Sequence, residues 1–398
     1  MLIYKKKISV VGMGYIGLPF ALLLASQGFI VKGIDINKKK ISQIKNGKII
    51  LEEEELISFF KKNYNKKNIE FSENFSISDF FILCLPTPLK KNNTCELNFI
   101  FNALKKIANV LQKNNTIIIE STIAIGDLEK LKNFVDKIRP DLINKYKICY
   151  VPEKAIPGNT IYEMQNNYRV IGSDLKTFKE VRKIYSKICK KKIIHTSVNE
   201  AEATKLIENA FRDNSIAFSN FISENLLKKG ISYKKVFEIC NLHPRVNILD
   251  PSIGVGGHCI PIDPYFLNFK KLNQIDLVGN SRKINDYKTK LIFKRILNFI
   301  QINNKKKICL WGLGYKPGVA DLRESPSIKI INKLNKMKIR FYVSDENYNL
   351  LKNLEVNIVN PTKALNSFDI HIILNVSQSF IQKKLKNKNY IYAKYLNP

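Results

Sequence analysis

The chain has 398 residues, of which 45% are hydrophobic, so it is long enough for two or three domains with buried cores and is not expected to be disordered. Its formal net charge of +32 would by itself favour a polyanionic partner such as a nucleic acid. However, lysines occur in almost every segment, arginines are few and no nucleic-acid-binding motif is present, so we interpret the lysines as solvated faces and expect no nucleic-acid partner.

The N-terminal part alternates strand-like and helix-like segments, which is typical of a parallel α/β sheet. A strand over Ile8–Val11, a glycine turn and a helix over Pro19–Ser26 lead to a second strand, Ile30–Ile34. A signal peptide or membrane span over Ile8–Val31 is disfavoured because three glycines and Pro19 interrupt it, so no membrane insertion is expected. Further segments of the same kind follow, with strands over Phe80–Leu85, Thr116–Glu120, Lys147–Val151 and Tyr168–Ile171 and a helix over Phe99–Leu111.

A long helix is predicted from about Glu200 to Lys229, where apolar residues recur at helical spacing. It would be about 45 Å long, enough to connect two domains. Lys205, Asn209 and Arg212 fall at i, i+4 and i+7 and share one face, which is either a solvated polar face or a functional one.

After a second helix over Asp286–Ile302, residues 306–315 repeat the pattern of residues 6–15, and strands are expected over Arg340–Ser344 and Ile370–Leu374. The predicted fold is therefore α/β, with two Rossmann-like domains built on parallel sheets and joined by a long central helix. We expect an NAD-binding domain at 1–198, a central helical dimerisation region carrying a catalytic cysteine at 199–303, and a smaller Rossmann-like domain at 304–398.

The motif Gly12-x-Gly14-x-x-Gly17 follows a strand and opens a helix, as a dinucleotide-binding turn requires. Asp35 ends the next strand, where a carboxylate can bind ribose hydroxyls and would repel a 2′-phosphate, so NAD is favoured over NADP. The second copy, Gly312-x-Gly314, has Pro317 in place of the third glycine. This copy is expected to bind a nucleotide-type ligand or only to share the fold.

Seven cysteines without CxxC or Cys/His ligand spacing predict no disulfide framework and no metal site, and they favour a reducing, cytoplasmic setting. A buried structural cysteine is the usual interpretation of any one of them. Cys259, however, follows a glycine-rich loop, stands beside His258 and lies near Asp263, which is compatible with an activated nucleophile. A thiol combined with NAD suggests oxidation of an aldehyde to an acid, since a thiohemiacetal can release hydride and become a thioester.

Several blocks in order along nearly the whole chain resemble the UDP-glucose/GDP-mannose dehydrogenase family. They are Gly12–Pro19, Leu85–Pro88, Glu120–Thr122, Pro152-Glu153, Glu202–Lys205, Gly256–Pro264 and Asp321–Pro326. The resemblance implies an NAD-dependent four-electron oxidation of a UDP-sugar C6 alcohol to a carboxylate, in a homodimer. The complete catalytic set argues against a non-catalytic relative, and a basic nucleic-acid-binding protein on a Rossmann scaffold is the alternative from another class.

Three stretches are similar to the branch that oxidises UDP-N-acetyl-D-mannosamine: Pro157–Asn159, Glu208–Asp213 and His243–Leu249. The in-class alternatives are UDP-N-acetylglucosamine and UDP-glucose, and the product would serve polysaccharide biosynthesis. Lys154 and Lys40 stand where the branch commonly has Arg, and Pro251–Gly254 replaces a more glycine-rich loop, which affects the expected affinity and not the reaction class.

The resemblance also implies residue roles. Cys259 would be the nucleophile, Lys205 and Asn209 would stabilise the oxyanion, and Asp263, Glu153 and Thr122 would handle protons and water. The expected NAD contacts, besides Gly12, Gly14 and Gly17, are Tyr15, Ile16, Asp35, Lys40, Thr87, Thr122 and Arg323. The expected UDP-sugar contacts are Lys154, Lys205, Asn209, Arg212, His243, Arg245, Gly256, Tyr315 and Lys316.

Overall fold

The computed structural model describes residues 6–49, 53–156, 158–269, 275–319, 321–347, 356–386 and 388–396. The chain forms two compact units: residues 1–207 with 265–268, and residues 208–264 with 269–398. The division falls inside helix α8 (Val198–Lys228). We call these parts unit 1 and unit 2 and describe each by itself.

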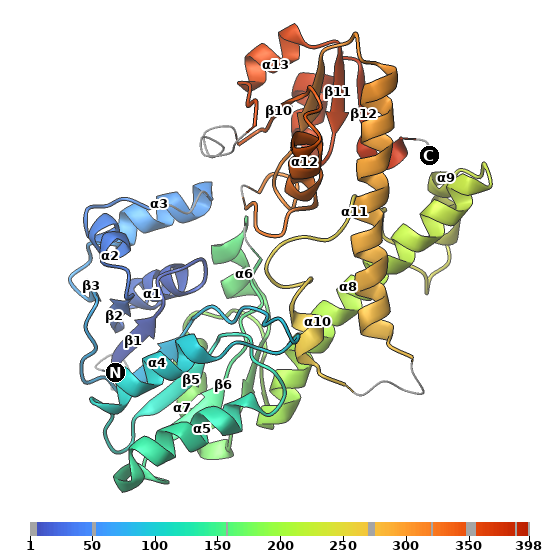
Figure 1. The fold of residues 1–398 in the computed structure, drawn as a ribbon. Coiled ribbons are helices and arrows are strands. Elements are labelled where there is room, and N and C mark those ends of the chain that lie inside the picture. The colour runs from blue at the N-terminus through green and yellow to red at the C-terminus, as the bar shows by residue number, and fades with distance from the viewer. Residues whose placement is uncertain are drawn as a thin grey trace. The chain divides into compact units, whose positions relative to one another are not determined.

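Unit 1 is built on an eight-stranded sheet with the order β3-β2-β1-β4-β5-β6-β7-β8 (Figure 1). All neighbouring strands are parallel except β6 and β7, which are antiparallel. The central strands β1, β4 and β5 are mostly apolar, and all their residues except Lys7 are buried, as is typical of strands covered on both faces. The bounds are β1 Lys7–Val11, β2 Ile30–Ile34, β3 Ile69–Ser72, β4 Phe80–Leu83, β5 Thr116–Ile119, β6 Lys147–Tyr150, β7 Arg169–Gly172 and β8 Ile193–Thr196.

The helices of unit 1 cover the sheet. Helix α1 (Gly17–Ser26) is apolar on nearly every side because it is enclosed by the sheet and by α3 and α6. Helices α4 and α5 pack side by side, with the ring centroids of Phe101 and Phe134 4.8 Å apart (Figure 1). The bounds of the helices after α1 are α2 Lys38–Lys45, α3 Glu54–Asn63, α4 Asn98–Ala108, α5 Asp127–Ile138, η2 Pro140–Leu142, α6 Thr160–Asn166 and α7 Leu175–Tyr185.

Unit 2 begins with most of α8 and continues with α9 (Tyr233–Cys240), the first two residues of α10 (Asp263–Phe266) and α11 (Leu277–Ile302). The contact between α8 and α11 is polar and buried. Glu224 accepts hydrogen bonds from Lys288 and, at 2.5 Å, from Arg295 Nη2. These charges satisfy one another inside the unit, and removal of one would leave the others without compensation.

A four-stranded parallel sheet of order β10-β9-β11-β12 forms the rest of unit 2. Its core joins the apolar faces of α11 and α12 to β9 and β11. The bounds are β9 Ile308–Trp311, α12 Pro326–Lys336, β10 Tyr342–Ser344, α13 Pro361–Ser367, β11 Ile370–Ile373, α14 Gln378–Phe380, η4 Ile381–Leu385, β12 Tyr390–Tyr392 and η5 Ala393–Tyr395.

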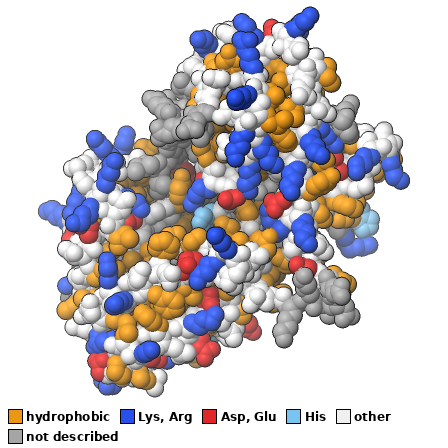
Figure 2. All heavy atoms as spheres, in the orientation of Figure 1, with side chains coloured by type: hydrophobic (Ala, Val, Ile, Leu, Met, Phe, Trp, Pro, Cys, Tyr) orange, Lys and Arg blue, Asp and Glu red, His pale blue; other side chains and the backbone are white. Residues whose placement is uncertain are grey.

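On the face drawn in Figure 2, Lys and Arg side chains are scattered among acidic and apolar groups and are not gathered into one continuous basic band. Over the described ranges, no helix combines the length and apolarity needed to cross a membrane. No group of three or more His, Cys, Asp or Glu side chains is placed to hold a metal ion in the same ranges.

Candidate functional site

The carboxyl ends of five parallel strands in unit 1 bring the N-terminal candidate residues to one edge of the sheet. The strands β1, β2, β4, β5 and β6 run in the same direction, and each is followed by a loop with predicted site residues. Open α/β sheets bind ligands at this edge. The residues are Gly12–Gly17 after β1, Asp35 after β2, Thr87 after β4, Thr122 after β5, and Glu153 with Lys154 after β6.

At each of the three glycines of the turn, an added side chain would meet different surroundings. Gly12 has a φ of +98°, and a Cβ there would lie 2.4 Å from the carbonyl oxygen of Cys84. A Cβ at Gly17 would lie 1.8 Å from the carbonyl oxygen of Gly12, so the helix can pack this closely only without a side chain. At Gly14 no heavy atom lies within 4 Å of an added Cβ, so the space above the turn is open. This open space at a helix N-terminus fits a dinucleotide pyrophosphate.

Asp35 holds the glycine turn as well as offering a carboxylate to a ribose. Its Oδ2 accepts a hydrogen bond from the Met13 backbone N–H at 2.9 Å, and its Oδ1 accepts one from Asn37 N–H at 2.9 Å. Lys40 Nζ donates to Oδ2 at 2.7 Å. Two of the residues expected to contact NAD, Asp35 and Lys40, therefore form an ion pair.

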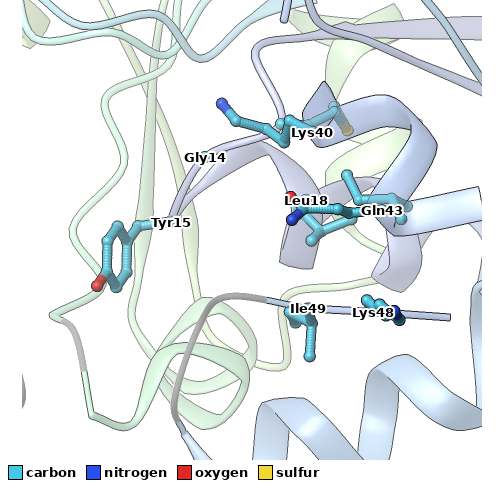
Figure 3. A pocket seen from close by; sticks show the side chains of 9 residues that line it. Gly14, Tyr15, Leu18, Lys40, Gln43, Lys48 and Ile49 are labelled. Atoms are coloured by element: carbon cyan, nitrogen blue, oxygen red, sulfur yellow. The ribbon is translucent and has the colours of Figure 1, made fainter. Parts of the chain in front are cut away.

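A hollow of about 210 Å³ opens beside the turn, between it and helix α2. Figure 3 shows Leu18, Gln43 and Ile49 on one side of the turn and Tyr15 projecting on the other. The wall is mainly apolar, with Lys40 and Lys48 at its margin; it is lined by Met13, Gly14, Tyr15, Leu18, Lys40, Gln43, Ile44, Lys48 and Ile49.

Ile16, another residue expected to contact NAD, precedes α1 and is half-buried. Its carbonyl accepts a hydrogen bond from Phe20 N–H.

Glu153 is buried and charge-compensated inside unit 1. Its Oε1 accepts hydrogen bonds from the backbone N–H groups of Lys154 and Ala155 at 2.6 and 2.7 Å. Arg169 Nη1 lies 2.6 Å from Glu153 Oε2, in an ion-pair contact whose angles fall outside hydrogen-bond geometry. The Lys154 ammonium lies 3.8 Å from the centroid of the Tyr168 ring. The loop after β6 thus has a fixed carboxylate at its start.

A second buried carboxylate lies in the same part of the unit. Glu120 accepts hydrogen bonds from the Tyr185 hydroxyl at 2.5 Å and from the Cys84 thiol at 3.2 Å. Burial raises the pKa of Glu120 to about 7, although Arg169 opposes this shift and Glu153 adds to it. Of the other predicted residues here, Thr87 is buried and Thr122 half-buried.

Helix α8 presents Lys205, Asn209 and Arg212 one turn apart, as the sequence spacing requires. Lys205 and Asn209 are buried, whereas Arg212 is exposed. Asn209 Nδ2 donates a 2.7 Å hydrogen bond to Asp263 Oδ2, which is also buried. This bond fixes the orientation of the Asn209 amide and leaves its second N–H for another acceptor.

The loop before Cys259 is glycine-rich because unit 2 leaves no room for side chains there. A Cβ at Gly257, where φ is +88°, would lie 2.8 Å from the Tyr315 ring, and one at Gly256 would lie 2.7 Å from the carbonyl oxygen of Glu324. Cys259 itself is exposed, and its carbonyl accepts a 2.8 Å hydrogen bond from Asp263 N–H at the start of α10. Cys259 therefore lies at the surface, in the turn that leads into α10.

The sequence suggested that the neighbouring His258 helps to activate the Cys259 thiol, but the charges around Cys259 give a different picture. Burial lowers the pKa of His258, and the nearby positive charge of Arg323 lowers it further while Asp321 opposes this. His258 is therefore a neutral imidazole at neutral pH, and Arg323 is one source of positive charge in this region. Arg323 pairs with Asp321, with Nη2 2.6 Å from Oδ2.

The C-terminal turn repeats the hydrogen bonding of the N-terminal turn. Asp345 Oδ2 accepts from Leu313 N–H at 2.6 Å and Oδ1 accepts from Asn347 N–H at 2.7 Å. However, a Cβ at Gly314 would lie 2.0 Å from the carbonyl oxygen of Val319. The following segment fills the space that is open at the first turn, so this copy does not offer the same cradle to a pyrophosphate.

The remaining predicted residues of unit 2 lie on loops. Tyr315 is half-buried against the glycine loop, and burial with the charges of Asp321 and Cys259 raises its pKa to about 12. Lys316, His243 and Arg245 are exposed. Pro157, the first residue of one branch-specific stretch, lies outside the described residues.

Two residues that bear on the site were not predicted from the sequence. Arg169, the charge partner of Glu153, could have been suspected because it is a lone arginine within an apolar strand, and a buried charge needs a partner. Glu53 holds the loop after β6 through backbone hydrogen bonds. It is one of four consecutive glutamates, and nothing in the sequence separates it from the others.

Comparison with known proteins agrees with this arrangement. Family models for the UDP-glucose/GDP-mannose dehydrogenase family match the chain in order: the NAD binding domain at 6–189, the central domain at 199–287 and the UDP binding domain at 309–394. The chain is 36% identical to the UDP-N-acetyl-D-mannosamine dehydrogenase of Methanococcus vannielii, over 98% of this chain and 92% of that protein.

Two solved structures have the same fold over almost their full length. The UDP-D-ManNAc dehydrogenase from Pyrococcus horikoshii has a TM-score of 0.85 at 28% identity, covering 98% of this chain and 96% of that one. The UDP-N-acetyl-mannosamine dehydrogenase from Staphylococcus aureus has a TM-score of 0.83 at 30% identity, covering 98% and 95%. The fold class and the NAD cofactor predicted from the sequence are confirmed. The chain therefore belongs to the UDP-glucose/GDP-mannose dehydrogenase family and is an NAD-dependent oxidoreductase of sugar nucleotides.

Proposed function

We propose that this chain oxidises the C6 alcohol of UDP-N-acetyl-D-mannosamine to the carboxylate, with two NAD per sugar and a covalent thioester on Cys259. The names of the relatives support the choice of sugar, since the relative from Methanococcus vannielii and the structures from Pyrococcus horikoshii and Staphylococcus aureus all carry the name of this activity. The matched NAD binding and UDP binding domains support the cofactor and the nucleotide part of the substrate.

The observation that carries the proposal is the linkage of an exposed thiol to two buried polar groups. Cys259 and Asp263 are joined by a backbone hydrogen bond of 2.8 Å, and Asp263 in turn fixes the Asn209 amide at 2.7 Å. A nucleophile needs access, and an oxyanion donor needs a fixed direction. This part of unit 2 supplies both.

The proposed reaction consists of two oxidations and one hydrolysis. Bound NAD would supply a hydride acceptor in each of two oxidations. Removal of a proton and a hydride from the alcohol gives the aldehyde, and the Cys259 thiolate adds to its carbon to form a thiohemiacetal after the oxygen takes a proton. Loss of the second hydride and the hydroxyl proton leaves a thioester, and water cleaves its C–S bond to give the carboxylate and the free thiol.

We assign roles in these reaction steps to the other catalytic residues from their charge and position. Lys205 would stabilise the alkoxide of the first step, and Asn209 would donate its second N–H to the oxyanion. Asp263 and Glu153 would exchange protons, with Thr122 orienting the hydrolytic water. The proposed NAD contacts are Gly12, Gly14, Tyr15, Ile16, Gly17, Asp35, Lys40, Thr87, Thr122 and Arg323, and the proposed UDP-sugar contacts are Lys154, Lys205, Asn209, Arg212, His243, Arg245, Gly256, Tyr315 and Lys316.

The test is the NADH yield from limiting UDP-N-acetyl-D-mannosamine, UDP-N-acetylglucosamine and UDP-glucose, measured with wild type, Cys259→Ala and the control Cys240→Ala. Cys240 is a half-buried cysteine of the same unit with no assigned role. Two NADH per UDP-N-acetyl-D-mannosamine, lost in Cys259→Ala and kept in Cys240→Ala, is the expected result. Two NADH from another sugar would replace the substrate, and acid formation by Cys259→Ala would refute the thioester.

We also propose a homodimer with three functional regions at 1–198, 199–303 and 304–398, located in the cytoplasm. Phe211, Phe218 and Phe221 lie at helical spacing on α8 and are 53–71% exposed in the single chain. Contiguous apolar exposure of this kind marks a protein interface. Light scattering after size-exclusion chromatography should give a dimer for wild type and a monomer for Phe218→Glu; a wild-type monomer would refute the proposal.

A further inference from the structure

Glu53 makes three hydrogen bonds to a segment more than a hundred residues away. Its Oε1 accepts from Gly158 N–H and from the Thr160 hydroxyl, both at 2.7 Å, and its Oε2 accepts from Thr160 N–H at 2.9 Å. Glu53 and Thr160 are both buried. Hydrogen bonds to a buried carboxylate are stronger than neutral ones, so this contact holds the segment firmly.

The segment is the loop between β6 and α6, and carboxylates accept hydrogen bonds from its described residues on both sides of position 157. Glu153 accepts from Lys154 and Ala155 N–H, and the Glu163 Oε2 accepts from Ile156 N–H at 2.8 Å. Glu53 belongs to neither flanking element, since it immediately precedes α3. It is therefore the residue that fixes the far end of the loop to a different part of unit 1.

The position and conformation of the loop give this contact a functional meaning. The loop leaves the carboxyl end of β6, on the same edge as the glycine turn, where open α/β sheets bind their ligands. Gly158 has a φ of +103°, a backbone state that glycine adopts readily, so the loop can turn at this residue. Asn159, the residue before α6, makes no side-chain capping bond, and Glu53 accepts the N–H of Thr160, the first residue of the helix.

We propose that Glu53 is a positioning residue for sugar-nucleotide discrimination, acting by fixing the described residues of the loop between β6 and α6, which carries the substrate contact Lys154. The inference rests on the proposed function, which assigns Lys154 to the substrate. A loop held at both ends presents Lys154 in one position, and release of one end lets it adapt to several sugars. Discrimination then falls because binding no longer selects one geometry.

The substitution Glu53→Gln tests this positioning role, because the side chain keeps nearly the same size and loses its charge. An amide has only one acceptor oxygen, so one of the two backbone N–H groups loses its partner. We expect the KM for UDP-N-acetyl-D-mannosamine to rise about tenfold, the KM for NAD to stay within about twofold, and the kcat/KM preference over UDP-N-acetylglucosamine to fall about tenfold, on the scale of one charged hydrogen bond. Glu55→Gln is the matched control, because Glu55 is an exposed glutamate two residues away.

A second pair of variants isolates one hydrogen bond. Thr160→Ser keeps the hydroxyl and Thr160→Val removes it, so only Thr160→Val should raise the KM for the UDP-sugar. If Glu53→Gln does not fold, this pair decides, and equal kinetics for Thr160→Ser and Thr160→Val would overturn the inference. Equal rises of both KM values in Glu53→Gln, or none, would also overturn it. A wild type that oxidises no UDP-sugar would instead refute the proposed function.

Discussion

Gly14 and Gly17 allow the fold of unit 1 and its cofactor binding to be perturbed separately. Both are glycines of one turn and lie three residues apart. An added Cβ would lie 1.8 Å from the carbonyl oxygen of Gly12 at position 17, but would have no heavy atom within 4 Å at position 14. Gly14 also lacks the positive φ that would strain an alanine.

The expected magnitudes follow from these distances. Gly17→Ala requires the turn to open by about 1 Å, and overpacking of this kind costs about 1–3 kcal/mol of unfolding free energy. Gly14→Ala costs no packing and restricts the unfolded chain, which stabilises a protein by about 0.4–1 kcal/mol. The new methyl group would, however, lie where the pyrophosphate must approach the backbone. We expect it to weaken NAD binding at least about tenfold, or about 1.4 kcal/mol.

Thermal unfolding of both variants with and without NAD, combined with a fluorescence titration of NADH, measures both effects. Without cofactor, Gly17→Ala should melt below wild type and Gly14→Ala should melt at or slightly above it. With NAD, Gly14→Ala should gain less stability than wild type, because the gain depends on affinity. If Gly14→Ala bound NADH as wild type does, the assignment of the open space to the pyrophosphate would be wrong.

Three further changes have expected outcomes. Glu224→Ala leaves Lys288 and Arg295 buried without their acceptor and should cost about 3–5 kcal/mol in denaturant unfolding. Asp35→Asn should raise the KM for NAD about tenfold and narrow the preference for NAD over NADP in steady-state kinetics. The folded pKa of Glu120, about 7, is above its ordinary 4.5, so the stability it contributes is complete below about pH 4.5 and is lost as pH rises through 7. Glu120→Gln should remove this loss, on the order of 1–3 kcal/mol, in urea unfolding at pH 5 and pH 8.

Three strands, β3, β8 and β12, were not predicted from the sequence, and all three lie at sheet edges, whereas the fourth edge strand, β10, was predicted within Arg340–Ser344. β3, β8 and β12 end the two sheets, and each has exposed or half-buried positions. An edge strand is covered on fewer sides, so its sequence needs fewer apolar residues and gives a weaker signal. The antiparallel pairing of β6 with β7 was also not predicted, because hydrophobic patterning carries no strand direction.

Helix α11 shows why periodicity misses polar packing. It begins at Leu277, nine residues before the predicted start at Asp286. The residues of this early part that are buried make polar contacts, with Arg282 Nη1 2.6 Å from Asp213 Oδ1 and Asn285 bonded to the same carboxylate. Apolar periodicity detects helices that bury hydrocarbon, and this part of α11 buries charge and amide groups.

The glycine turns show the same limit at the level of the site. Both place a backbone N–H on an aspartate at the end of the next strand, Asp35 in one and Asp345 in the other. The sequence distinguishes the two turns only by the missing third glycine of the C-terminal copy. The structure distinguishes them by what lies next to the second glycine of each motif. That space is open at Gly14 and is occupied by the chain itself at Gly314. A Gly-x-Gly motif therefore specifies a turn and its hydrogen bonds, and the path of the following residues decides whether a ligand phosphate can reach it.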